Sequence, residues 1–220
     1  MMNNTINSTM ARWVKMNQTH TNQPDMTQRS KQEIIVTGFG GQGIVLAGRI
    51  LGMAAALKDD KESTLVQSYG PESRGGACCA QVVISDTIIQ FPYILTPDIL
   101  ICMSHTAYEK YCDALKPEGF LLTDKDLVTP KQDRDYFAIP ATRMAEELGR
   151  KMMANIIMVG FATAVTALVS KEAALYAVTA SVPKGTEEMN ATAFNKGYDY
   201  GTSLLKGRVQ KASGTTRANQ

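Results

Sequence analysis

The glycine-rich segment at residues 38–43 constrains the fold of this chain more than any other feature of the sequence. It is Gly-Phe-Gly-Gly-Gln-Gly, and it lies between a short apolar run at residues 33–37 and an almost wholly apolar run at residues 44–57. The first run has the length of a buried strand, and the second has that of a buried helix. A G-x-G-x-x-G sequence between a strand and a helix is typical of loops that approach a phosphate closely.

The residue types of this segment suit an anionic ligand. Glycines let the backbone turn sharply, and the N–H groups at the start of the following helix then face the anion together with the positive end of the helix dipole. A tight strand-to-helix turn without any ligand is the alternative. The predicted cofactor-binding residues of the segment are Gly38, Gly40, Gly41, Gln42 and Gly43.

Two common classes of phosphate-binding site agree less well with this sequence. An NAD site needs an acidic residue at the end of the second strand. That strand is predicted at residues 64–68, and Tyr69 and Gly70 follow it. The nucleotide-hydrolase sequence G-x-x-x-x-G-K-[ST] is also missing, because Ile44 and Val45 follow Gly43. An NAD-dependent oxidoreductase is therefore disfavoured, and so is an ordinary nucleotide hydrolase.

The remaining patterns indicate a Rossmann-like α/β sheet with flanking helices in a single domain, because strands and helices alternate early and helices cluster late. Pro92 indicates that one apolar segment, residues 88–94, is an edge strand or a bulge. Ser170 is the expected N-cap of a helix that ends before Pro183. Further strands are predicted at residues 64–68, 77–85, 99–103, 120–124 and 136–139, and helices at residues 107–115, 142–153, 155–169 and 189–204.

The two ends of the chain differ from this domain, which is predicted at residues 33–205. Residues 1–32 are rich in Asn, Thr and Gln and poor in aliphatic side chains, so we expect a disordered N-terminal tail. Residues 206–220 form a polar C-terminal tail. No apolar run reaches the roughly 18 residues that a membrane span needs. The net charge of +2 gives no reason to expect a nucleic-acid partner, and we expect a cytoplasmic protein.

The four cysteines do not have the spacing of a metal or cluster site. Cys78, Cys79, Cys102 and Cys112 form no C-x-x-C pair, whereas iron–sulfur and zinc sites need closely paired ligands. We expect reduced cysteines that pack as small apolar side chains. His105 is a conceivable general base, but a hydrogen-bonded histidine at the end of a strand is the preferred interpretation. No catalytic residue and no metal ligand are therefore predicted.

A second unusual loop occupies residues 68–76, Ser-Tyr-Gly-Pro-Glu-Ser-Arg-Gly-Gly, between two predicted strands. Arg74 stands among glycines, where its planar guanidinium can reach a phosphate; an exposed arginine in a flexible hairpin is the alternative. Taken together, G-F-G-G-Q-G-I-V-L-A-G and Q-S-Y-G-P-E-S-R-G-G-A resemble the gamma subunits of 2-oxoacid:ferredoxin oxidoreductases. The resemblance extends over residues 33–205, and the tyrosine of the second loop is similar to the 2-oxoglutarate type.

The resemblance implies a function within a multisubunit enzyme. Such enzymes decarboxylate a 2-oxoacid oxidatively, reduce ferredoxin and transfer the acyl group to coenzyme A. Thiamine diphosphate, magnesium and the iron–sulfur clusters are held by partner subunits of the alpha, beta and delta types, and the gamma subunit helps to bind coenzyme A. Ser73 and Arg74 are then the expected phosphate contacts, together with Ser104 at the end of a buried strand.

Several alternatives remain open within and beyond this resemblance. Pyruvate, a branched-chain 2-oxoacid or indolepyruvate could replace 2-oxoglutarate as the substrate. Fused relatives tend to carry lysines where Glu72 and Ser73 stand here, so the neutralisation of the ribose phosphate of coenzyme A is not explained. A purely structural subunit, whose loops contact a partner and no cofactor, is the remaining alternative.

Overall fold

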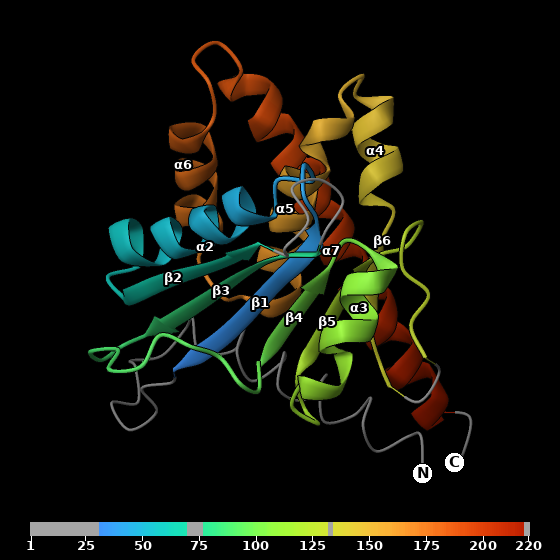
Figure 1. Cartoon of the computed structure of the whole chain (residues 1–220). Coiled ribbons are helices and arrows are strands. Elements are labelled where there is room, and N and C mark those ends of the chain that lie inside the picture. Colours follow the sequence, from blue (N-terminus) through green and yellow to red (C-terminus); the bar gives the residue numbers. More distant parts are fainter. Residues whose placement is uncertain (1–30, 70–76, 132–133, 218–220) are drawn as a thin grey trace.

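A mixed β-sheet with helices on both faces forms the centre of the protein (Figure 1). The structure is a computed structural model that describes residues 31–69, 77–131 and 134–217. The predicted single α/β domain is confirmed. Its strands are β1 (Gln32–Phe39), β2 (Glu62–Tyr69), β3 (Ala77–Ser85), β4 (Ile99–Cys102), β5 (Phe120–Asp124) and β6 (Phe137–Ile139). Its helices are α2 (Ile44–Lys58), α3 (His105–Tyr111), α4 (Ala141–Glu147), α5 (Ala154–Thr166), α6 (Lys171–Ser181) and α7 (Glu187–Arg217), with short 3-10 helices η2 (Cys112–Ala114) and η3 (Lys151–Met153).

The order of the strands differs from that of a simple parallel sheet. The order is β2-β3-β1-β4-β5-β6. The strands β1, β4, β5 and β6 run parallel, whereas β3 is antiparallel to both β1 and β2. The hairpin β2–β3 thus lies on one side of β1, and the parallel strands lie on the other. As a result, the end of β1 faces the loops that follow β2 and β4.

Successive side chains of the central strands point to opposite faces of the sheet, so the core has one part on each face. Ile34 and Val36 belong to the core that includes residues of α2, α4, α5, α6 and α7, while Ile35 belongs to the core that includes residues of α3. Figure 1 shows α2 and α6 over one face and α3 over the other. Helix α5 is buried along its whole length, which explains why its sequence is apolar all round.

Residues 88–94 are not a strand, so this prediction is wrong. Both neighbours of β1 are already present as β3 and β4, and the segment instead connects the end of β3 to the start of β4. It is attached to the sheet through a side chain, since the Ile94 N–H donates to Gln81 Oε1 at 2.8 Å. The side chains of Ile88 and Phe91 are largely exposed. The apolar residues of this segment thus belong to a connection and not to an edge strand or a bulge.

Two predicted helices begin or end at other residues in the structure. The helix expected at residues 107–115 begins at His105 and changes to a 3-10 turn after Tyr111. The helix expected at residues 142–153 is split into α4 and η3, because Gly149 between them has a φ of +78°. A left-handed residue ends a helix.

Three further predictions concern the start of α6 and the two ends of the domain. Ser170 is confirmed as the N-cap of α6, where its Oγ accepts the Ala173 N–H at 3.1 Å. Helix α7 continues through Arg217, beyond the predicted domain boundary at Leu205; the boundary itself stays a prediction. The N-terminal tail expected at residues 1–32 lies almost wholly outside the described residues. Within residues 31–69, 77–131 and 134–217, every helix is too short or too polar to cross a membrane.

Candidate cofactor-binding site

The glycine-rich loop joins the carboxyl end of β1 to the amino end of α2. Gly41 and Gly43 have φ values of +96° and +72°, and such left-handed backbone is easily adopted by glycine. Gly43 is the N-cap of α2, and no described side chain caps this helix. The first N–H groups of a helix have no partner within the helix itself. The predicted strand–loop–helix arrangement is confirmed.

The four glycines of the loop fall into two pairs with different surroundings. A Cβ atom on Gly38 would lie 2.5 Å from Gln42 Oε1 and 2.7 Å from Ile44 Cδ1, and one on Gly43 would collide with the Asn155 side chain. A Cβ atom on Gly40 or Gly41 would have no described atom within 4 Å. Gly38 and Gly43 are therefore required by packing, and Gly40 and Gly41 face the open side of the loop.

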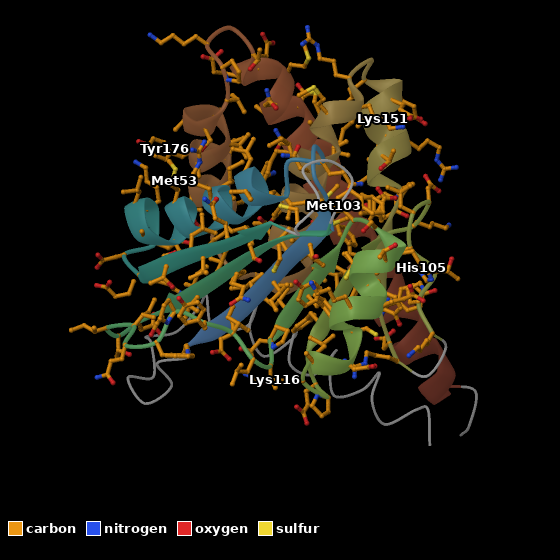
Figure 2. All side chains as sticks on the ribbon, in the orientation of Figure 1. Met53, Met103, His105, Lys116, Lys151 and Tyr176 are labelled. Carbon is orange, nitrogen blue, oxygen red and sulfur yellow. The ribbon has the colours of Figure 1, made fainter. Side chains whose placement is uncertain are left out.

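Gln42 braces the loop from inside. Its Oε1 accepts the Phe39 N–H at 2.6 Å, and its Nε2 donates to the Met103 carbonyl at 2.9 Å. Met103 follows β4 and is labelled in Figure 2 near the carboxyl end of the sheet. The side-chain amide thus connects the loop to the end of the neighbouring strand. The predicted contact of Gln42 with a cofactor stays a prediction. Because the side-chain amide already makes these two hydrogen bonds, the backbone of Gln42 would make most of that contact.

Asn155 braces the other end of the loop. It is buried near the start of α5, and its Nδ2 donates to the Gly43 carbonyl at 3.1 Å. That carbonyl also accepts the Ala47 N–H at 2.9 Å, the first hydrogen bond of α2. The sequence did not single out Asn155, because a residue 112 positions away carries no local signal of this contact.

Ser104 lies where the sequence placed it, directly after the buried strand β4. Its side chain is buried, and its Oγ accepts the Ala107 N–H at 3.3 Å as the N-cap of α3. The neighbouring His105 is half exposed, with Nε2 3.8 Å from Glu109 Oε1 and its ring stacked on Tyr108. Figure 2 shows His105 on the outer side of α3, apart from Met103. Both residues thus have structural contacts.

Asp124 is a buried carboxylate at the same end of the sheet that sequence reasoning did not single out. It ends β5 and is fully buried. Its Oδ2 accepts the Thr142 N–H at 2.9 Å and the Thr142 hydroxyl at 2.6 Å, and its Oδ1 accepts the Asp126 N–H at 3.0 Å. These donors compensate the buried charge and anchor the first turn of α4. Its sequence context, an ordinary apolar strand, gave no signal.

The second loop can be placed only through the strands that flank it. Ser73 and Arg74 lie outside the described residues, so their predicted phosphate contacts stay predictions. Strand β2 ends at Tyr69 and β3 begins at Ala77, which pairs with Phe39 at the end of β1. The second loop therefore leaves and re-enters the sheet beside the glycine-rich loop.

The four cysteines are free and buried. Burial raises the pKa of the Cys102 thiol strongly, and it also raises that of Cys79, which a hydrogen bond from Tyr111 lowers in part. Burial likewise raises the thiol pKa values of Cys78 and Cys112. These protonated thiols pack as small apolar groups. Among the described residues, no three His, Cys, Asp or Glu side chains are grouped so that they could hold a metal ion.

A mixed β-sheet with a glycine-rich strand–loop–helix turn at the end of β1 places this protein in the class of α/β proteins with a loop of the phosphate-binding type. Residues 33–200 match the pyruvate ferredoxin/flavodoxin oxidoreductase family, and the chain belongs to this family. The chain is 52% identical over 181 residues to the 2-oxoglutarate synthase subunit KorC of Methanocaldococcus jannaschii, covering 80% of this chain and 97% of that protein.

Two further comparisons agree with this one. The KorC subunit of 2-oxoglutarate synthase from Methanothermobacter marburgensis is 48% identical over 176 residues, which cover 76% of this chain and 95% of that protein. The crystal structure of a keto/oxoacid ferredoxin oxidoreductase gamma subunit from Geobacter sulfurreducens matches with a TM-score of 0.70 at 39% identity, covering 78% of this chain and 99% of that one. The predicted resemblance to gamma subunits of the 2-oxoglutarate type is confirmed.

Proposed function

We propose that this chain is the gamma subunit of a 2-oxoglutarate:ferredoxin oxidoreductase and that its glycine-rich loop forms part of the coenzyme A site. In the overall reaction, 2-oxoglutarate loses CO2, its acyl group becomes a thioester of coenzyme A, and two electrons pass to two ferredoxins. The chain would bind and orient coenzyme A, and the acyl transfer itself would take place on groups held by other subunits.

The observation that carries the proposal is the open side of the loop at Gly40 and Gly41. A Cβ atom at either position would meet no described atom within 4 Å, although the loop is braced at both ends by Gln42 and Asn155. Among the described residues, no side chain would have to move for a pyrophosphate to approach the backbone here. The N–H groups of the loop and of the first turn of α2 would then donate to its oxygens.

A second helix end strengthens the same site. Asn155 is the second residue of α5, and its hydrogen bond to Gly43 brings the start of α5 against the start of α2. Each helix adds a partial positive charge at its amino end. Two such ends beside one open loop favour a ligand with several phosphate charges, as coenzyme A has.

The relatives support an inference about the substrate and the partner subunits. The two KorC subunits are parts of 2-oxoglutarate synthases and are 52% and 48% identical to this chain. We infer that 2-oxoglutarate is the substrate and that alpha, beta and delta subunits complete the enzyme. Those subunits would supply the thiamine diphosphate, magnesium and iron–sulfur clusters that the oxidation needs. The cytoplasmic location stays a prediction.

The sheet topology argues against a free-standing NAD-dependent oxidoreductase. In such enzymes the second strand lies parallel beside the first and carries the acidic residue that binds the ribose. Here the antiparallel strand β3 lies between β1 and β2. The end of β2, Ser68 and Tyr69, is also not acidic.

The substrate can be tested on the native complex. The chain would be tagged in its own host, purified anaerobically with its partners, and assayed for coenzyme A-dependent viologen reduction. We expect activity with 2-oxoglutarate that is lost when coenzyme A is omitted. Activity with pyruvate alone would correct the substrate, and a chain that purifies without partners and without activity would refute the subunit assignment.

The role of the loop can be tested with Gly40→Val in the same complex. A side chain on the open face should raise the KM for coenzyme A by roughly tenfold, equal to about 1.4 kcal/mol of lost binding, and leave the KM for 2-oxoglutarate unchanged. Gly207→Ala is the control, because Gly207 also has no described atom near its Cβ position but lies on α7. Equal coenzyme A constants in both variants would contradict the proposal.

Arg74→Ala separates cofactor binding from a purely structural role of the second loop. A raised KM for coenzyme A with normal assembly would support a phosphate contact. Failed assembly, with an unchanged KM in any surviving complex, would identify a loop that contacts a partner subunit instead.

A further inference from the structure

The brace between Asn155 and Gly43 has a consequence for the direction of the N–H groups at the start of α2. The peptide unit is planar and trans, so its C=O and N–H point in opposite directions. The carbonyl of Gly43 is held from two sides, by Asn155 Nδ2 at 3.1 Å and by the Ala47 N–H at 2.9 Å. The N–H of Ile44 in the same peptide unit is therefore directed away from the helix, towards the loop.

The Asn155 side chain is itself held in one orientation. Its Oδ1 accepts the Ile156 N–H at 2.9 Å within the first turn of α5, which leaves Nδ2 to donate to Gly43. The side chain is only 3% exposed, and a Cβ atom on Gly43 would collide with it. The amide and the glycine thus fit each other, and neither can move without disturbing the other.

We propose that Asn155 is a positioning residue for coenzyme A: through the Gly43 carbonyl it fixes the direction of the first N–H group of α2, that of Ile44, which would donate to the phosphate. This inference rests on the proposed function of the loop. Asn155 itself contacts no ligand in this role, because its amide is buried behind the loop. It acts by holding the donor in place before the cofactor arrives, so that binding costs less ordering of the backbone.

Asn155→Asp and Asn155→Ala test the proposal in the purified complex. The aspartate retains an acceptor for the Ile156 N–H, but its carboxylate cannot donate to the Gly43 carbonyl and places a negative charge beside the two helix ends. The alanine removes the donor without adding a charge. We expect both variants to raise the KM for coenzyme A by roughly tenfold and the aspartate to have the larger effect.

Asn190 provides a matched control on α7. It is a buried asparagine whose Nδ2 also donates to a backbone carbonyl, that of Thr186 at 2.8 Å, but its contacts lie within the start of its own helix. Asn190→Asp and Asn190→Ala should lower the thermal midpoint of the complex and leave both KM values unchanged. A merely structural role of Asn155 would give the same result as Asn190.

The measured quantities are the KM for coenzyme A, the KM for 2-oxoglutarate, kcat and the thermal midpoint of each complex. A raised KM for coenzyme A alone in the Asn155 variants supports the proposal. An unchanged KM in these variants, with a raised one in Gly40→Val, would overturn it and leave the coenzyme A function intact. An unchanged KM for coenzyme A in the Asn155 variants and in Gly40→Val would refute the proposed function as well. The proposal would also be overturned if the complexes with the Asn190 variants assemble and those with the Asn155 variants do not, because Asn155 would then be needed for folding.

Discussion

Gly38 and Gly40 show that two glycines of one motif can be required for different reasons. Gly38 lies under Gln42 and Ile44, so an added methyl group would disturb the brace that Gln42 makes to Met103. Gly40 has no described atom within 4 Å of its Cβ position and no left-handed backbone. The motif in the sequence does not distinguish them, since the difference arises from side chains that fold back onto the loop.

This difference predicts that the same substitution affects stability at one position and hardly at the other. Gly38→Ala should destabilise the chain by about 1–3 kcal/mol, because the new methyl group overpacks a filled space. Gly40→Ala should change stability by less than about 0.5 kcal/mol. Thermal unfolding of the purified complexes compares the two, and an equal loss of stability in both would show that the loop glycines have the same role.

At the scale of elements, the crossing of α5 and α7 depends on small residues. A Cβ atom on Gly160 would collide with the Phe194 carbonyl, and one on Gly197 would collide with the Ile157 carbonyl. The two helices thus approach each other backbone to backbone. This close approach places the start of α5, and with it Asn155, against the glycine-rich loop.

Gly197→Ala should therefore destabilise the protein by roughly 2 kcal/mol or more, because the helices must separate to admit a methyl group. Gly207→Ala, on the same helix, should instead stabilise it by about 0.5–1 kcal/mol, since alanine favours a helix and meets no described neighbour there. Thermal midpoints measured side by side test both directions. Stabilisation by Gly197→Ala would mean that α5 and α7 are packed less closely than the structure shows.

At the scale of the whole molecule, the two ends of the sheet serve different purposes. The carboxyl end carries the loops described above, and the amino end is held by charges. Lys116 Nζ lies 3.1 Å from Asp98 Oδ1 and 3.3 Å from Glu33 Oε2, and Asp98 also accepts the Glu33 N–H at 3.0 Å. In Figure 2 Lys116 lies at the opposite end of the sheet from Met103.

The charge cluster at the amino end predicts a pH dependence. Partial burial alone would lower the pKa of Lys116, but hydrogen bonds to and charges of Asp98 and Glu33 outweigh it and raise the pKa above its ordinary value of 10.5. A raised pKa in the folded state means that the stabilisation is fully present below the ordinary value and is lost as the pH rises through the raised one. Lys116→Met should therefore reduce stability at neutral pH, and its difference from the unchanged protein should vanish at strongly alkaline pH.

Unfolding measured between neutral and alkaline pH checks this prediction. Lys131→Met is the control, because the Lys131–Asp113 pair is largely exposed, with 3.9 Å between the charged atoms, and should contribute little at any pH. A constant difference between Lys116→Met and the unchanged protein across the whole range would show that packing of the lysine stem, and not its charge, stabilises the sheet.

The sequence by itself determined the family of this protein and most of its elements. The apolar runs of β1 and α2 and the glycines between them predict a strand, a loop and a helix because their preferences are local. The same holds for Ser170, whose capping contact spans three residues. Residues 88–94 show the limit of such local preferences, since their pattern resembles an edge strand but the segment connects β3 to β4 and pairs with no strand.

The tertiary structure decided which residues surround the loop and what each of them does. Gln42 bonds to Met103 from 61 residues away, and Asn155 bonds to Gly43 from 112 residues away. The buried carboxylate of Asp124 depends in the same way on Thr142. Such contacts form because the sheet brings its carboxyl ends to one edge and the helices pack against it, and no local pattern in the sequence encodes that proximity.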